Sequence, residues 1–217
     1  MIITVVGQHL VELPAELGTL HLDVVAVDED RAAALQHVQQ RTNDLLRELK
    51  RRGATPDSPV ERHVVQAPQV WAEQRFDQNG QPSGSSHRAS VAVRITFRNA
   101  AALSAFTAVW GESPEIQLGH VAWELTEATR TRHQDEVLGR AIDDARRRAA
   151  VMARAAGCGE PALRELADPG LLGGAASTSA ESAPLVFAQA RPAKADAIEL
   201  APERITLSAA VHARFEA

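Results

Sequence analysis

The stretch "QDEVLGRAIDDARRRAAVMARAAGCG", Gln134 to Gly159, combines an aspartate pair, an arginine run and the only cysteine of the chain. On a helix, with about 100° of rotation per residue, its small and aliphatic residues share an arc of about 120°, the width of a core-facing stripe. Because alanine lets two backbones approach closely, we expect a helix packed against a sheet or another helix. The members of the stripe are Leu138, Ala141, Ile142, Ala145, Ala149, Met152, Ala153 and Ala156.

The charged residues of this stretch are expected on the opposite, solvated side of the helix. Asp143 and Asp144 are adjacent, so their side chains point about 100° apart and cannot share a proton or a metal ion. Pairs spaced four residues apart contribute about 0.2–0.5 kcal/mol each, as ordinary surface reinforcement. These pairs are Glu136–Arg140, Arg140–Asp144, Asp143–Arg147 and Asp144–Arg148.

The cysteine is predicted to belong to the end of the helix. Gly157 and Gly159 flank Cys158, and glycine is the commonest residue just beyond a helix C-terminus. The negative end of the helix dipole disfavours a thiolate there, which argues against a nucleophile. The interpretation is therefore a packing helix with a stop signal and no site.

Composition narrows the class of protein. The chain has 217 residues, 45% hydrophobic and 24% charged, with a formal net charge of −5. These values are typical of a soluble globular protein, and the lack of a basic face argues against nucleic-acid binding. One cysteine fits a reducing compartment, and "MIITVVGQHLVEL" has neither a basic region nor an apolar run long enough for a signal or a span. We expect a cytoplasmic protein with no membrane insertion.

The rest of the chain alternates strand and helix patterns. Strands are predicted at 2–13, 19–27, 62–76, 90–97, 115–125, 185–192 and 203–216, and further helices at 31–52 and 98–111. The resulting fold class is α/β (α+β), a mixed, largely antiparallel sheet with about three helices packed on it. We expect one domain over residues 1–217 with a flexible loop at about 168–184.

Several local signals refine this picture. Pro68 predicts an edge or a bulge because it lacks a ladder donor, and Asn79-Gly80 and Ser83-Gly84 predict a hairpin loop over 77–88. The apolar residues of 115–125 change faces in mid-strand, which predicts a β-bulge near Gly119-His120. Asp28 or Asp30 and Asn99 are expected to cap helices. The residues Leu103, Phe106, Val109 and Trp110 are expected to face the core.

No catalytic spacing emerges from the sequence. The eight histidines form no H-x-H, H-x₃-H or HExxH pattern, and "GLLGG" at 170–174 does not run from a strand into a helix. His21, His63 and His212 alternate with the apolar residues of their strands and are expected to be solvated. We therefore assign no catalytic, cofactor-binding or metal-binding residues and no cofactor.

With this order of elements, the chain resembles the SIMPL domain family, also called DUF541. The family's late alanine-rich helix and its glycine-containing stop correspond to Ala141, Ala145, Ala149, Ala153 and "AAGCGEPALREL". Its middle strand, short helix and following strand correspond to "SVAVRITFRNAAALSAFTAVW" and "EIQLGHVAWEL", and its last strand to "APERITLSAAVHARFEA". The chain departs from the family in having Pro202-Glu203 where Pro-Gly is usual, His87 or Arg88 where an aromatic is usual, and no secretion signal.

The resemblance implies an α/β domain and a tendency to oligomerise, in some members into rings, but no catalytic residues. The expectation is a non-enzymatic protein that acts by oligomeric assembly or by binding a protein partner. The alternative is a small-molecule-binding protein or an enzyme with a pocket near the 168–184 loop, built from Arg, His and Glu residues of separate elements.

Overall fold

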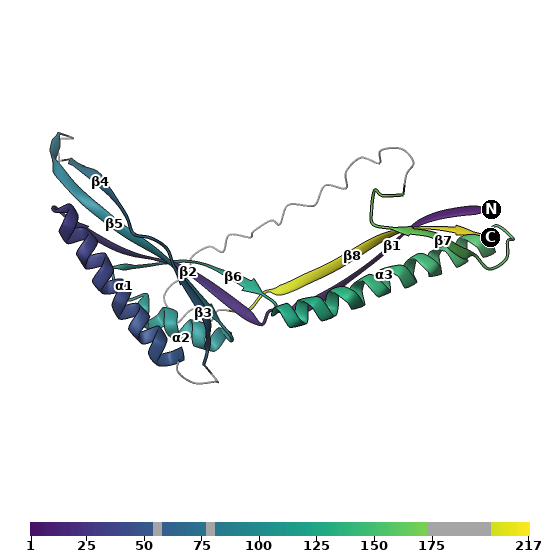
Figure 1. Cartoon of the computed structure of the whole chain (residues 1–217), viewed down its shortest axis with the longest axis horizontal. Coiled ribbons are helices and arrows are strands. Elements are labelled where there is room, and N and C mark those ends of the chain that lie inside the picture. The colour runs from purple at the N-terminus through teal and green to yellow at the C-terminus, as the bar shows by residue number, and fades with distance from the viewer. Residues whose placement is uncertain (54–57, 77–80, 173–200) are drawn as a thin grey trace. The chain divides into compact units, whose positions relative to one another are not determined.

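The computed structural model describes residues 1–53, 58–76, 81–172 and 201–217. These contain three helices and eight strands, and the strand pairs are antiparallel, which confirms the α+β class (Figure 1). The predicted strand at 185–192, the Asn79-Gly80 turn and residues 173–184 of the predicted loop lie outside the described residues. The elements are β1 (Ile2–Pro14), β2 (Leu17–Asp28), α1 (Arg31–Gly53), β3 (Val60–Val65), β4 (Gln69–Phe76), β5 (Pro82–Phe97), α2 (Ala100–Trp110), β6 (Ile116–Glu124), α3 (Glu127–Ala155), β7 (Ala162–Ala167) and β8 (Arg204–Glu216).

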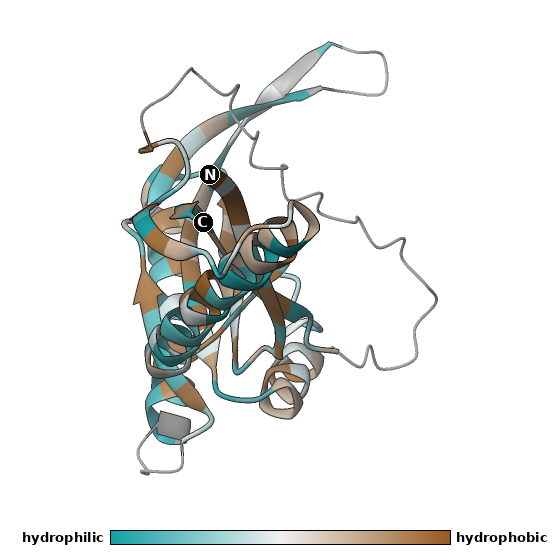
Figure 2. Ribbon diagram, turned by 90° about the vertical axis from the view of Figure 1, so that its right-hand side faces the viewer, coloured by the Kyte–Doolittle hydropathy of each residue, from teal (hydrophilic) through white to brown (hydrophobic). Residues whose placement is uncertain are grey.

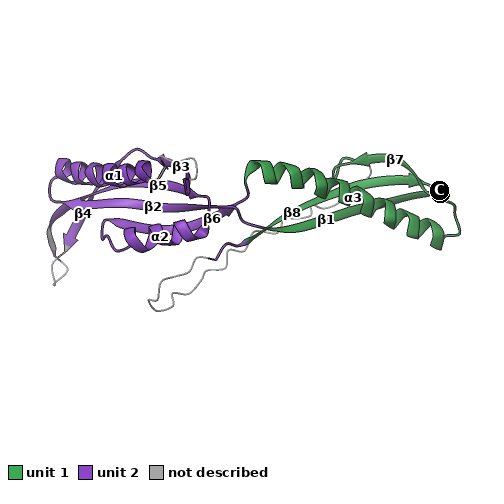
Figure 3. Cartoon of the chain, turned by 90° about the horizontal axis from the view of Figure 1, so that it is seen from below, with its two compact units in different colours: residues 1–13, 126–194, 204–217 green, residues 14–125, 195–203 purple. Residues whose placement is uncertain are grey.

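The chain folds into two compact units (Figure 3). Of the described residues, 1–13, 126–172 and 204–217 form unit 1, and 14–53, 58–76, 81–125 and 201–203 form unit 2. Most of unit 2, residues 14–125, is thus inserted in the sequence between β1 and α3 of unit 1. The single sheet expected from the sequence is two sheets, one in each unit.

Unit 1 is a three-stranded sheet in the order β1-β8-β7 with α3 along one face. Hydrophobic and hydrophilic residues alternate around α3, as Figure 2 shows. The alternation predicted for 203–216 is confirmed, since every second side chain of β8 turns toward the helix. The buried core consists of Ile3, Val5, Ala141, Ala145, Ala149, Ala153, Val211, Ala213 and Phe215.

The buried residues of α3 form one row spaced four residues apart. They are Val137, Ala141, Ala145, Ala149 and Ala153. Because four residues turn a helix by about 400°, each step of this row rotates by about 40°, and the contact line winds around the helix. Leu138 and Met152 point along the average direction of the row but are 41% and 48% exposed. Their predicted burial is wrong, as is that of Ala156, because the sequence argument assumed one fixed face.

The closest backbone contact of unit 1 lies at Gly7 of β1. A Cβ atom at this position would lie 2.1 Å from the Ala141 carbonyl oxygen and 2.7 Å from Ala145 Cβ. Only glycine fits between the strand and the helix there. The alanines of α3 and Gly7 of β1 are therefore the two sides of one close contact, which confirms the close approach expected from the alanines.

Both ends of α3 are capped. At the start, the Thr126 side chain accepts a hydrogen bond from the Thr129 N–H, at 3.3 Å. At the end, Gly157 has a φ of +71°, and the Cys158 N–H donates to the Ala153 carbonyl oxygen at 2.9 Å. This pattern satisfies the last free carbonyl groups of the helix. Cys158 packs against the core of unit 1, so its predicted place in the stop signal is confirmed.

Part of the charged face of α3 binds the backbone of β1. The Asp144 Oδ2 atom accepts a hydrogen bond from the Gln8 N–H at 3.1 Å, and Arg148 donates to the Val6 carbonyl oxygen at 2.6 Å. Backbone groups two residues apart point to the same edge of a strand, and β1 is the outer strand of its sheet. The two side chains thus supply the acceptor and donor that a neighbouring strand would offer.

The sequence interpretation of this charged face is wrong for Asp144, whose side chain is only 16% exposed. It remains correct for Asp143, which is 65% exposed. The ion pairs Asp143–Arg146 and Asp144–Arg147 join residues three apart, not four apart as the spacing rule suggested.

Unit 2 is a sheet in the order β3-β5-β2-β6, with β4 also paired to β5, and α1 and α2 cover one face. The alternation predicted for 90–97 is confirmed by burial of Val91, Val93, Ile95 and Phe97. Helix caps are confirmed as well, since Asp30 accepts from the Ala33 N–H and Asn99 from the Ala102 N–H. The other core residues are Leu20, Leu22, Val24, Ala34, Val38, Leu45, Leu49, Val60, Ala89, Leu103, Phe106 and Ile116.

Four details of the structure differ from the sequence expectations. The strand predicted at 62–76 is two strands, because the stretch around Pro68 interrupts pairing with β5. Ser83-Gly84, expected in a turn, belongs to β5. Val109 is 62% exposed, since it lies on the outer side of α2. The short strand β7 has no strong alternation and was not predicted.

Replacing Gly7 by alanine is expected to destabilise unit 1 by about 2–3 kcal/mol, because the added methyl group overlaps the helix backbone. Gly139 is the matched control. A Cβ there meets no atom within 4 Å, so Gly139→Ala should stabilise α3 by about 0.5–1 kcal/mol. Urea denaturation followed by far-UV circular dichroism measures both changes. Equal effects of the two substitutions would contradict the close contact.

The adjacent aspartates offer a second comparison. Asp144→Ala should lower the free energy of unfolding by about 1–2 kcal/mol, because it removes the charged acceptor of the Gln8 N–H. Asp143→Ala should change it by less than about 0.5 kcal/mol. Urea denaturation followed by far-UV circular dichroism measures both changes, and tryptophan fluorescence reports on unit 2, where all three tryptophans lie.

This comparison also depends on pH. The Gln8 N–H bond and the neighbouring Arg147 hold the pKa of Asp144 below its usual value. A lowered carboxyl pKa adds stability above the unfolded-state pKa, and this stability is lost as the pH falls through the folded-state pKa. The difference between wild type and Asp144→Ala should therefore shrink in acid. A difference that stays constant down to the acid transition would rule out this role for Asp144.

Candidate functional site

The strand pairing of unit 2 shows which residues share the face of the sheet that carries no helix. Residues paired across neighbouring strands point to the same face. Arg94 of β5 lies opposite His21 of β2 and opposite Val64 of β3. In the same way, Thr96 lies opposite Thr19 and Arg62. We call this surface the open face, and it includes Thr19, His21, Asp23, Val27, Arg62, Val64, Trp71, Arg88, Arg94, Thr96, His120 and Glu124.

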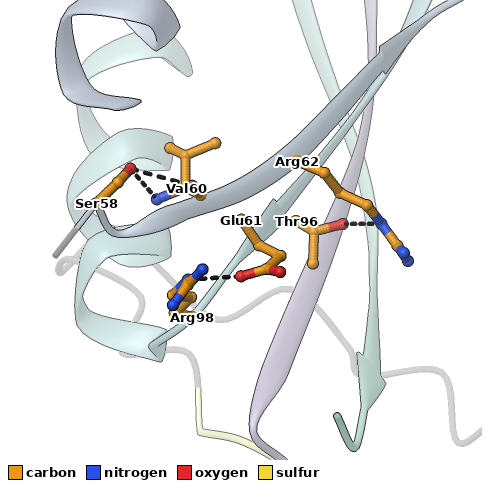
Figure 4. Close-up of polar contacts among 6 residues, drawn as sticks. All are labelled: Ser58, Val60, Glu61, Arg62, Thr96 and Arg98. Atoms are coloured by element: carbon orange, nitrogen blue, oxygen red, sulfur yellow. Dashed lines mark hydrogen bonds and ion pairs between the residues drawn. The ribbon is translucent and has the colours of Figure 1, made fainter. Parts of the chain in front are cut away.

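An arginine lies across the open face. The Arg62 Nε–H donates to Thr96 Oγ1 at 3.3 Å (Figure 4). The end of its guanidinium lies 3.5 Å from Glu124 of β6. The hydroxyl groups of Thr19 and Thr96 are 3.0 Å apart and nearly fully buried. Arg62 therefore links the two outer strands β3 and β6 and donates to a hydroxyl on β5, one of the two strands between them.

The start of β3 is fixed independently. The Ser58 hydroxyl lies 3.0 Å from both the N–H and the carbonyl oxygen of Val60, and Glu61 forms an ion pair with Arg98 (Figure 4). The Arg98 N–H also donates to the Pro59 carbonyl oxygen at 2.9 Å. These contacts set the position of β3 against the end of β5 and hold Arg62 over Thr96.

The predicted β-bulge in β6 is confirmed, and it has a chemical consequence. The register with β2 shifts between Leu20 and Leu22, so Gly119 and His120 together oppose His21. A Cβ at Gly119 would lie 2.9 Å from the His21 carbonyl oxygen, so glycine allows the strands to stay close. The bulge places the His120 ring on the His21 ring, with centroids 4.2 Å apart and planes 17° apart.

These imidazoles lie in a positive environment. Partial burial, His120 and Arg94 lower the pKa of His21 from its usual value, and Glu124 opposes this shift. The neutral form of His21 is therefore favoured while no anion is bound. Arg94 is exposed, and its guanidinium forms no ion pair with any described residue. The centre of the open face is thus a cationic group beside two stacked rings.

Exposed apolar side chains accompany this centre. Val64 is 44% exposed beside Arg94. Farther along the sheet, Trp71 of β4 and Val27 of β2 both lie opposite Arg88 and are 42% and 46% exposed. Arg88 lies 3.9 Å from Glu73, so its charge is compensated. The open face therefore carries both apolar and cationic groups.

The structure places the histidines differently from the expectation. His63 is exposed, as predicted, but His21 is half-buried, and its stacking partner was not considered. The sequence predicted the bulge because the apolar residues of this strand change faces. The stacking of His120 on His21 could not be predicted, because it also requires knowing that β2 and β6 pair.

Other hollows lie outside the open face. One of about 540 Å³ lies between α1 and α2 and is lined in part by Arg51 and Trp110. Another of about 660 Å³ lies beside Asp144 and Arg148, which already bind β1. Among the described residues, no three His, Cys, Asp or Glu side chains are grouped to hold a metal ion. In that part of the chain, no helix is both long and apolar enough to cross a bilayer.

One of the comparisons with known proteins identifies a family. A search of curated proteins found no match to the chain. The family model described as "Protein of unknown function (DUF541)", named SIMPL, matches residues 3–215. The match includes the alanine row of α3 in unit 1 and the bulged strand of unit 2. The chain therefore belongs to the SIMPL (DUF541) family.

Proposed function

We propose that this SIMPL-domain protein is a binding module without a reaction of its own, which acts by oligomeric assembly or by binding a protein partner. The open face of the five-stranded sheet is the docking surface in this proposal. The observation that carries it is the order of that surface, where side chains of four strands are held in place although neither described helix of unit 2 packs on them.

Order of this kind favours binding, because side chains that are already fixed lose little entropy when a partner arrives. Arg62 is held by Thr96 and Glu124, and the two imidazoles are held by their stacking. A flat sheet surface with fixed polar groups suits a protein surface better than a small ligand, which is usually enclosed in a concave pocket. The exposed tryptophan Trp71 is a residue type enriched at binding hot spots.

The alternative, a ligand pocket near 168–184, depends mainly on residues outside the described part of the chain. Of that segment, only 168–172 are described, and they line neither of the two hollows of about 540 and 660 Å³. No specific observation favours an enzymatic site, so the binding module is the function that we propose.

Substitutions on the open face test this proposal. Native mass spectrometry over a wide concentration range measures assembly, and affinity capture from host cells measures partner binding. We expect an oligomer or a stoichiometric partner for the wild type. Val64→Asp should weaken it, because the substitution removes an exposed apolar side chain and places a carboxylate opposite Arg94, whose charge it would compensate.

Val109→Asp is the matched control, since Val109 is an exposed valine on the outer side of α2. It should leave the oligomer or the captured partner unchanged. A chain that is monomeric at every concentration and captures no partner would remove the proposal. Equal loss in both variants would remove the open face as its location.

A further inference from the structure

We propose that Arg94, with His21 and His120 beside it, forms a carboxylate-binding site for an acidic segment of a partner protein. This inference rests on the proposed binding function and names the chemistry of the partner. It concerns the centre of the open face, where β5, β2 and β6 lie side by side.

Arg94 differs from the other arginines of the open face. Arg62 lies 3.5 Å from Glu124 and Arg88 lies 3.9 Å from Glu73, so both charges are compensated within the protein. Arg94 lies in the middle strand pair, is exposed and has no acidic neighbour of this kind in the described part of the chain. A planar guanidinium offers paired N–H donors that match a carboxylate.

The charged groups around His21 give this site a pH dependence. They are Arg94 on β5 and His120 and Glu124 on β6, the two strands that flank β2. Asp23, two residues along β2 on the same face, accepts a hydrogen bond from the Ser90 hydroxyl at 3.4 Å. In the free protein, Arg94 and His120 oppose protonation of His21. A bound carboxylate would favour protonation, so the pKa of His21 should rise in the complex and binding should take up a proton. Affinity is therefore expected to increase as the pH falls through the histidine range.

The charge of the site also argues against the same face of a second copy as the occupant. A two-fold dimer through this surface would place Arg94 and the histidines against their own copies, and like charges at an interface are unfavourable. An extended acidic segment supplies the opposite charge. Its apolar side chains can contact Val64, which is 44% exposed next to Arg94.

A short fluorescent oligoglutamate peptide is the probe, titrated into the full chain and followed by fluorescence anisotropy. Arg94→Gln should weaken binding about tenfold, the effect of losing one charge-assisted hydrogen-bonding group. Arg154→Gln removes the same net charge from unit 1 and should change affinity less than twofold. Similar losses in both variants would show attraction by net charge only and overturn the site.

The histidines require a separate variant, because a structural role could also weaken binding. The double substitution His21→Asn and His120→Asn should leave binding near pH 8 within about twofold and abolish its increase toward pH 6. Tryptophan fluorescence and circular dichroism confirm that each variant is folded. If the double variant keeps the full pH dependence, the imidazoles do not belong to the site.

Two further results separate this inference from the proposed function. If acetate competes with the peptide at its own binding concentration, the site holds small anions and the partner segment is wrong. If Val64→Asp disrupts assembly or capture while Arg94→Gln changes neither capture nor peptide binding, the open face is a docking surface but its partner is not acidic.

Discussion

The structure depends on one constraint: among the described residues of each unit, helices pack on only one face of the sheet. A sheet of amphipathic strands must bury its apolar face against another layer. In unit 1 that layer is α3, and in unit 2 it is α1 and α2 together. The remaining face of the five-stranded sheet must therefore be made compatible with water by its own side chains. Two features do this in the protein. Arg62 lies across the buried threonines, and His21 and His120 stack on each other.

In unit 1, a single helix is enough to bury the apolar face of the sheet. One helix covers β1 and β8 because its alanine row and Gly7 bring the backbones into contact. The same close approach brings Asp144 and Arg148 within reach of the backbone of β1. A free strand edge invites pairing with other chains, and side chains that occupy its N–H and carbonyl groups reduce that tendency. Asp144 and Arg148, which were expected on the solvated side of the helix, are thus part of the fold.

Most elements and the C-terminal end of α3 could be predicted from the sequence, because caps, glycine stops and alternation are local signals. The start of α3 at Glu127, after the Thr126 cap, was not predicted. The phase change near Gly119-His120 gave the bulge correctly. Leu138 and Met152 were misassigned because the direction of contact rotates along α3, which depends on the strands beneath it. Arg94, His21 and His120 could not be grouped, since they come from three strands whose order in the sheet is a long-range property.

Electrostatic interactions connect the open face to the proposed binding function. Burial, His120 and Arg94 lower the pKa of His21, so the pKa of His21 should respond to any anion that approaches Arg94. The most direct measurement is an NMR titration of the His21 imidazole in the full chain, with and without an acidic peptide. The account predicts a pKa below the usual histidine value in the free chain and a clear rise when the peptide is present. An unchanged pKa with the peptide present would contradict it.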